Sequence, residues 1–246
     1  MAGVDLQARA SAQYDDYYKD GASEWRRLGA IDKADNIVAL CGHLPLRSVL
    51  EIGAGDGSIL SRLSEVGFGR ELYAVEISAS GVDVIQKRNI PQLVECRLFD
   101  GYQLPYEAGR FDLAILSHVI EHVDHPRQVL YEAARVARYV FVEVPTEDIS
   151  RRPANYVATH VGHINFYSPR TIRWLVQSCG LHVLRQMTTN PSKATYLHQA
   201  GRKGAVHFHV KQWLLSLAPA LAIKHFCYHE ALLATSPGVV PDEWPR

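Results

Sequence analysis

Hydrophobic and polar positions along the chain alternate in a way that predicts strands and helices in turn. Short runs rich in Val, Ile and Leu are typical of buried parallel strands, and they occupy 48–52, 71–75, 111–116 and 139–144. Helical spacing is seen in the stretches between them, at 58–66, 79–88 and 126–137. This alternation predicts an open, parallel sheet with helices on both faces.

The N-terminal part departs from this alternation. Residues 6–42 predict two helices, the second running from about Gly29 to Cys41, and the first carries Tyr14, Tyr17 and Tyr18. We therefore expect a helical cap or lid over 1–42, in front of one main domain over 43–246.

The C-terminal part predicts a helix, a strand, a second helix and a last strand, near 169–179, 181–187, 204–222 and 226–234. The segment 188–224 is expected to be an insertion between the last two strands, where substrate or partner contacts are common. Taken together, the pattern predicts an α/β fold with a Rossmann-like doubly wound sheet, mostly parallel with an antiparallel last strand.

Composition narrows the classes of protein to consider. The chain has 246 residues, with 26 Lys and Arg against 26 Asp and Glu, so its formal charge cancels. A chain that wraps nucleic acid by bulk electrostatics is not expected to have this balance. The sequence shows no secretory signal and no apolar run long enough to span a membrane. Its four cysteines form no C-x-x-C pair, which favours reduced thiols and a cytoplasmic location.

A glycine-rich turn is the strongest local signal. The run V-L-E-I-G-A-G-D-G ends a predicted strand at Ile52 and places Gly53, Gly55 and Gly57 before a predicted helix. Glycine permits positive φ and leaves room for a ligand against the backbone. Such turns also serve simply to join a strand to a helix, so the loop alone is weak evidence.

An acidic residue on the next predicted strand strengthens the signal. Glu76 ends the run Y-A-V-E, at the distance from Gly53 where a carboxylate can accept hydrogen bonds from both ribose hydroxyls. Two carboxylates, Glu51 and Asp56, flank the glycines, and they would repel the pyrophosphate of a dinucleotide. The loop therefore suits a nucleoside cofactor that carries sulfonium and ammonium groups.

With these motifs, the segment 49–144 resembles the class I S-adenosylmethionine-dependent methyltransferases, especially the small-molecule group that contains the ubiquinone and menaquinone biosynthetic enzymes. The resemblance extends from 48 to roughly 180 and implies S-adenosyl-L-methionine as cofactor. It implies that the methionine and adenosine parts are lined by Glu51, Gly53, Ala54, Gly55, Asp56, Gly57, Ser117 and His118. Glu76 would hold the ribose, Ile77 would lie against adenine, and Asp100 with Gly101 would accept the adenine amino group. Asp100 could also serve only as a turn residue.

Two histidine-containing segments follow the strand at 111–116. The first is S-H-V-I-E-H at 117–122, and the second is H-I-N-F-Y-S-P at 163–169, in which Ser168 and Pro169 are typical of a helix start. Related methyltransferases show both an E-H pair and a segment like the second. The formal H-x-x-E-H match to a zinc peptidase is rejected, because that motif requires a helix interior.

Three roles for these histidines remain open. His122 or His163, with His118 beside them, could act as a general base that removes a proton from the acceptor. They could instead be structural. They could also hold a divalent ion, with candidate ligands His118, Glu121, His122 and His163 or His160; nitrogen-rich ligands would favour zinc or iron. A metal is allowed by these residues but is not expected.

The remaining polar clusters are assigned to the lid and the acceptor pocket. Tyr18, with Tyr14, Tyr17, Trp25 and Arg26, is expected to fold over the cofactor, although the tyrosines could merely pack a surface helix. The acceptor wall is expected within 145–167, which includes Glu147, Arg151, Arg152, Asn155, Tyr156 and His160. A C-terminal helix with the apolar residues Val210, Trp213, Leu214, Leu217 and Leu221 is expected to pack on the sheet or on a second copy, as a homodimer would.

The resulting hypothesis is a methyltransferase that acts on the O or N atom of a small-molecule biosynthetic acceptor, with no nucleic acid partner expected. Two alternatives stay open. One is a methyltransferase acting on a macromolecule, such as an RNA end, a protein or a glycan. The other is a non-catalytic cofactor-binding protein, or a cyclase, on the same fold.

Overall fold

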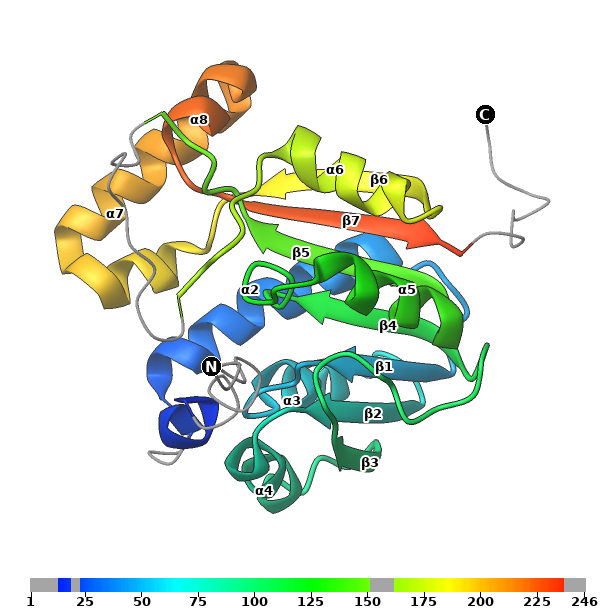
Figure 1. The fold of residues 1–246 in the computed structure, drawn as a ribbon. Coiled ribbons are helices and arrows are strands. Elements are labelled where there is room, and N and C mark those ends of the chain that lie inside the picture. Colours follow the sequence, from blue (N-terminus) through cyan, green and yellow to red (C-terminus); the bar gives the residue numbers. More distant parts are fainter. Residues whose placement is uncertain (1–12, 19–22, 151–161, 237–246) are drawn as a thin grey trace, which may run out of the picture.

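The computed structural model describes residues 13–18, 23–150 and 162–236. A seven-stranded sheet in the order β3-β2-β1-β4-β5-β7-β6 runs through its centre (Figure 1). The strands are β1 (Ser48–Ile52), β2 (Glu71–Glu76), β3 (Leu93–Leu98), β4 (Phe111–Ser117), β5 (Ala137–Pro145), β6 (His182–Thr189) and β7 (His229–Thr235). The predicted α/β class and the predicted antiparallel last strand are confirmed.

The direction of β7 decides which residues meet at the functional edge of the sheet. β1 to β5 pair in parallel, whereas β7 runs antiparallel to both β5 and β6. Its first residue, His229, therefore lies opposite Pro145 at the end of β5 and opposite Thr189 at the end of β6. The start of β7 thus joins the carboxyl ends of the parallel strands, where ligands bind in open α/β sheets.

Helices cover both faces of the sheet (Figure 1). Side chains of α5 and α6 share one buried core with Leu50 and Ile52 of β1, and those of α2, α3 and α4 share the other with Val49. Neighbouring side chains of a strand point to opposite faces, so this strand supplies both cores. The helices are α2 (Glu24–Cys41), α3 (Ser58–Glu65), α4 (Ala79–Lys87), α5 (Pro126–Val136), α6 (Pro169–Ser178), α7 (Lys193–Leu217) and α8 (Pro219–His225).

The second N-terminal helix begins earlier than predicted. α2 starts at Glu24 rather than near Gly29, because the Ser23 side chain accepts a hydrogen bond from the backbone N–H of Arg26. Trp25 and Arg26 therefore lie in the first turn of α2 rather than in a separate lid loop. Residues 13–18 form the described part of the predicted first helix.

The insertion contains two helices where one was predicted over 204–222. α7 begins after Ser192, whose side chain caps it, and it is kinked at Ala200 and Gly201, where Gly201 has φ +54°. Pro219 then starts α8, since proline fits the first turn of a helix but not its interior. The last strand consequently begins at His229 rather than near 226.

The apolar residues of the insertion do not pack on the sheet as predicted. Val210, Trp213 and Leu217 of α7 and Leu221 of α8 are exposed, and Leu214 is only partly buried. The sheet contact was therefore wrong, and a contact with a second copy stays a prediction.

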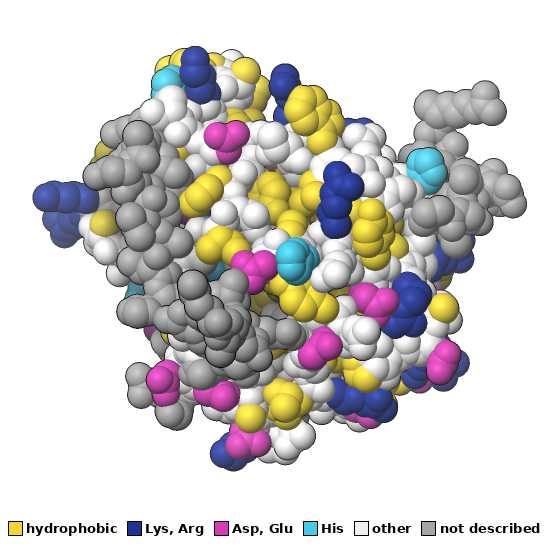
Figure 2. Space-filling view, viewed as in Figure 1, with side chains coloured by type: hydrophobic (Ala, Val, Ile, Leu, Met, Phe, Trp, Pro, Cys, Tyr) yellow, Lys and Arg dark blue, Asp and Glu magenta, His cyan; other side chains and the backbone are white. Residues whose placement is uncertain are grey.

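Charged side chains of both signs are interspersed on the face seen in Figure 2, which agrees with the balanced composition. Within the described ranges, no helix combines the length and apolarity that a membrane span needs.

Candidate active site

Two neighbouring cavities open at the carboxyl edge of the sheet. The larger has a volume of about 740 Å³ and the smaller about 130 Å³. They share a wall formed by Tyr14, Tyr18, Gly53, His118 and His122. The smaller cavity extends toward β3, and the larger extends toward α7 and the start of β7, so the two could hold different ligands side by side.

The glycine loop adopts the backbone that its sequence predicts. Gly53, Gly55 and Gly57 have φ of +70°, +59° and +73°. A Cβ added to Gly55 would lie 2.7 Å from the Tyr18 hydroxyl, so a larger residue would be strained by its conformation and by this contact. The loop thus approaches Tyr18 closely and leaves its backbone open to a ligand.

Glu76 closes the loop from the neighbouring strand. Its side chain is buried and accepts hydrogen bonds from the Gly55 N–H at 2.8 Å and the Ser78 N–H at 3.1 Å. Burial raises the pKa of Glu76, while these backbone donors oppose the shift. Glu76 lines the smaller cavity, and its bonds to the ribose stay a prediction.

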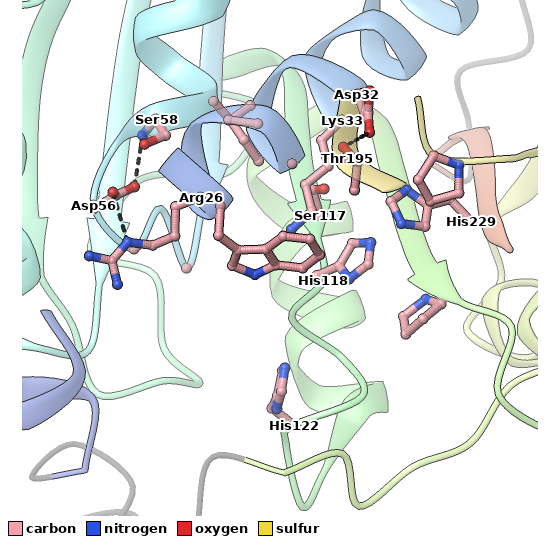
Figure 3. Close-up of a pocket in the computed structure, with 18 of the residues that line it drawn as sticks. Arg26, Asp32, Lys33, Asp56, Ser58, Ser117, His118, His122, Thr195 and His229 are labelled. Atoms are coloured by element: carbon pink, nitrogen blue, oxygen red, sulfur yellow. Dashed lines mark hydrogen bonds and ion pairs between the residues drawn. The ribbon is translucent and has the colours of Figure 1, made fainter. Parts of the chain in front are cut away.

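The two carboxylates of the loop have different surroundings. Asp56 is paired with Arg26 at 3.2 Å (Figure 3) and with Arg88 at 2.9 Å. Glu51 is buried, burial raises its pKa well above the ordinary value, and its Oε2 has no hydrogen-bond partner among the described residues. Of the two residues predicted to face the cofactor ammonium, Glu51 is therefore the better placed.

The smaller cavity is lined by the residues that were predicted to contact adenine. Ile77, Phe99, Val119 and Val123 supply apolar walls, and Asp100 and Gly101 lie at its end. Asp100 Oδ1 accepts hydrogen bonds from the N–H groups of Tyr102 at 2.8 Å and Gln103 at 2.7 Å. Asp100 therefore stabilises the turn, as its alternative role predicted, and its contact with adenine stays a prediction.

The tyrosines of residues 13–18 cover this edge. The rings of Tyr14 and Tyr18 are stacked with centroids 6.1 Å apart, and Arg26 lies 5.6 Å from the Tyr18 ring centroid. Asp15 fixes the segment by accepting hydrogen bonds from the Ser78 hydroxyl and the Ser80 N–H. Burial raises the pKa of Tyr18, so its phenol stays neutral. The tyrosines thus lie over the glycine loop, as expected of a lid.

The second predicted histidine segment joins the first at the floor of the larger cavity. His122 and His163 have ring centroids 4.7 Å apart, and His163 Nδ1 lies 2.5 Å from Glu147 Oε2. Glu121 is fully buried, and neither carboxylate oxygen has a hydrogen-bond partner within the described part of the chain. Glu121 and His122 lie in a turn between β4 and α5, which agrees with the rejection of a helical peptidase motif.

The four predicted metal-ligand candidates belong to two adjoining groups, which meet where His118 Nδ1 lies 3.3 Å from Glu121 Oε1. One group combines Glu121, His122 and His163, and the other combines His118 with Glu143 and His229. In each group the ligand atoms lie within 4.8 Å of one another. Each offers two imidazoles and one carboxylate, a donor set that suits zinc or iron. His160, Arg151, Arg152, Asn155 and Tyr156 fall outside the described residues.

Sequence reasoning missed Glu143, His229 and Asn36. Glu143 Oε1 lies 3.0 Å from His229 Nδ1 and accepts a hydrogen bond from the Asn36 amide at 2.8 Å, and Oε2 accepts one from the Ser117 hydroxyl at 2.9 Å. Glu143 is the polar residue within the apolar run at 139–144, and this break in the pattern was the available signal. His229 could have been found only by knowing that the last strand starts at this edge.

A buried lysine closes the far end of the larger cavity. Lys211 of α7 donates hydrogen bonds to the Tyr196 hydroxyl and the Cys227 carbonyl, and its ammonium lies 4.6 Å from the Tyr228 ring centroid. Burial lowers the pKa of Lys211 to about 8. The cavity therefore has a cation at this end and imidazoles near the cofactor loop.

The shifted pKa of Lys211 predicts a pH-dependent stability difference. The unfolded chain keeps the Lys211 proton up to its ordinary pKa of 10.5, whereas the folded protein loses it near 8. Wild type should gain stability relative to Lys211→Met as pH rises from about 8 to 10, by up to about 1.4 kcal/mol per unit. Urea unfolding at several pH values measures this difference. A difference that stays constant with pH would show that Lys211 is not desolvated.

Comparison with known proteins identifies the family. The sequence profile of the methyltransferase domain family matches residues 18–186, more than half of the chain. The mitochondrial ubiquinone biosynthesis O-methyltransferase of Candida albicans is 23% identical over 185 residues, covering 70% of this chain and 54% of that protein. The chain spans between 28% and 60% of the length of the curated relatives it matches.

Solved structures share the fold at low identity. Magnesium protoporphyrin IX methyltransferase from Synechocystis PCC 6803 with bound S-adenosylmethionine has a TM-score of 0.60 and 18% identity, covering 96% of this chain and 99% of that one. A [4+2]-cyclase has a TM-score of 0.62 and 16% identity, covering 84% and 80%. The profile match and the fold agree with the motifs at the glycine loop. This chain therefore belongs to the methyltransferase domain family.

Proposed function

We propose that this protein transfers a methyl group from S-adenosylmethionine to an oxygen or nitrogen atom of a small-molecule acceptor. The observation that carries the proposal is the larger cavity, whose volume of about 740 Å³ lies within the range of small-molecule sites. It shares a wall with the smaller cavity, where the adenosine part is expected, and it is also lined by Glu51 and Gly55, which are predicted to hold the methionine part. An acceptor in the larger cavity would therefore meet the methyl group at this shared wall.

The chain's own residues would align the reactants and exclude water. When bound, S-adenosylmethionine supplies a methyl group on an electrophilic sulfonium, so alignment contributes most of the remaining rate increase. Glu76, Gly55 and Glu51 would hold the cofactor, with Glu51 facing the ammonium. Tyr14 and Tyr18 would cover the shared wall and keep it dry.

His163 is the best-placed general base in this proposal. Its Nδ1 contacts Glu147 at 2.5 Å, which fixes the ring and leaves Nε2 as the other functional atom. His163 and His122 both line the larger cavity. Burial lowers the pKa of His122, so His122 stays neutral and can share a proton with its neighbour.

A transfer assay with methyl-labelled S-adenosylmethionine tests the proposal. We expect label to enter at least one member of a panel of phenols, catechols, hydroxy acids and amines. Total RNA, protein lysate and glycans serve as parallel acceptors. Label that enters only one of these macromolecular pools would overturn the small-molecule assignment. Cofactor binding without transfer to any acceptor would favour a non-catalytic or cyclase role on this fold.

A further inference from the structure

Three metal-binding side chains from separate strands meet on one wall of the larger cavity. His118 follows β4, Glu143 belongs to β5, and His229 begins β7. The rings of His118 and His229 have centroids 4.7 Å apart, and one ligand atom of each residue lies within 4.8 Å of the others. Two ligands of a tetrahedral zinc ion lie roughly 3.4 Å apart, as bonds of about 2.1 Å require. Small rotamer changes would bring the three together.

One nitrogen of this group lacks the partner that a buried atom normally has. His118 Nε2 is buried and makes no hydrogen bond to any described residue. The side chains of His118 and His229 are only 16% and 14% exposed, and His229 Nδ1 lies 3.0 Å from Glu143 Oε1 without a well-aligned hydrogen bond. An unpaired buried nitrogen is costly, and a metal ion would give His118 Nε2 a partner.

Hydrogen bonds from two side chains fix the orientation of the Glu143 carboxylate. Asn36 donates to Glu143 Oε1 at 2.8 Å and Ser117 donates to Oε2 at 2.9 Å. Such outer hydrogen bonds orient metal ligands in proteins. The backbone supports the same arrangement, because His118 has φ +57°, a strained conformation for a residue with a side chain. Its N–H is bonded to the Glu143 carbonyl at 2.9 Å.

A cation lines the same cavity as His118 and His229. Lys33 is part of the wall of the larger cavity, and its charge opposes a bound metal ion electrostatically. A carboxylate of a bound ligand in the same cavity would offset this charge.

We propose that His118, Glu143 and His229 bind one zinc-like transition-metal ion whose open coordination position faces the acceptor. His118 and His229 line the larger cavity, and Figure 3 shows both among the side chains of its wall. Three protein ligands with a fourth open position are typical of catalytic zinc. The acceptor part of the inference rests on the proposed function and names an acceptor that coordinates through oxygen, such as a catechol or a hydroxy acid.

The reaction then divides between the two histidine groups. The acceptor hydroxyl at the ion would lose its proton more readily, and that proton would pass to His163. The oxygen lone pair forms the bond to the methyl carbon, and the electrons of the carbon–sulfur bond return to sulfur, which leaves S-adenosylhomocysteine. The group of Glu121, His122 and His163 would thus take up the proton, because Glu147 already contacts His163 Nδ1 and would stabilise the protonated ring.

Metal titration of untagged protein tests the site without any assay of activity. After treatment with a chelator, wild type should bind one Zn²⁺ per chain by calorimetry and elemental analysis. His229→Gln and Glu143→Gln should weaken binding more than about 100-fold, beyond the effect of losing an outer-shell partner. Exposed His182, on β6 at the far end of the sheet, provides the matched control His182→Gln. Circular dichroism of the metal-free variants checks that they fold.

The variants of the other group decide the assignment. His122→Gln and His163→Gln should keep the ion, and visible absorption of Co²⁺-loaded protein should change only in Glu143→Gln and His229→Gln. Loss of the ion in His163→Gln with retention in His229→Gln would assign it to the Glu121 group and overturn the proposal. Wild type that binds no Zn²⁺ would overturn it as well. Zn²⁺ bound as expected without methyl transfer would defeat only the proposed function.

Discussion

Replacing Glu76 by Gln is expected to weaken binding of S-adenosylmethionine about 100-fold, because hydrogen bonds to a charged group contribute roughly 1.5–3 kcal/mol each. Glu76 is buried, and both of its oxygens accept backbone hydrogen bonds, from Gly55 and Ser78. The glutamine amide keeps the shape of the side chain but presents a donor in place of one acceptor. Calorimetric titration with S-adenosylmethionine and S-adenosylhomocysteine measures the loss.

A control on the same strand separates cofactor binding from stability. Glu71 begins β2, at the other end from Glu76, and pairs with Arg47 at 2.9 Å on the surface. Glu71→Gln should leave cofactor affinity unchanged, since exposed ion pairs contribute little. Equal affinity of Glu76→Gln and wild type would show that the ribose is held elsewhere, and the assignment of the smaller cavity would then fail.

The cofactor half of the site was predictable because it lies within one βαβ unit. Gly53, Gly55 and Gly57 follow directly on β1, and Glu76 ends the neighbouring strand β2. These residues meet because β1 and β2 are neighbouring parallel strands, whose carboxyl ends lie at the same edge of the sheet. The sequence alone therefore places them at one edge of the sheet, and the profile match agrees with the family that they indicated.

The acceptor half was less predictable because its residues come from distant parts of the chain. Asn36 of α2 contacts Glu143 of β5 across 107 positions. His229 reaches the same wall only because β7 runs antiparallel to β5. Strand order and direction in the last two strands decide which polar residues meet, and no local spacing encodes that choice. Glu143 therefore looked like part of a buried strand.

The helix boundaries that were predicted wrongly are marked in the sequence by capping serines and a proline, which the spacing of apolar residues does not show. Ser23 and Ser192 each cap a helix that starts earlier than its apolar spacing suggests. Pro219 divides the predicted helix 204–222 because its ring cannot continue a helix from Ala218. These corrections place Arg26 against Asp56 and Lys211 in the cavity, so small boundary shifts changed the description of the site.

Replacing His163 by Gln is expected to lower kcat by about 100-fold or more for an identified oxygen acceptor, within the range for loss of a general base. The Michaelis constant for S-adenosylmethionine should change little, because His163 is not among the residues predicted to hold the cofactor. Glu147→Gln should lower kcat less, roughly 10-fold, since it would leave the imidazole in place and remove only its orienting partner. Steady-state rates with saturating cofactor measure both effects.

The comparison with His122→Gln shows which imidazole takes the proton. The two rings have centroids 4.7 Å apart, so either could reach an acceptor at the shared wall. If His163 is the base, Glu147→Gln should shift the acid limb of the profile of kcat against pH. The reason is that the Glu147 carboxylate favours the protonated imidazole. His122→Gln should keep the wild-type limb at a lower rate. A normal rate in His163→Gln, with a shifted limb in His122→Gln, would transfer the role of base to His122 and leave Glu147 as a structural partner.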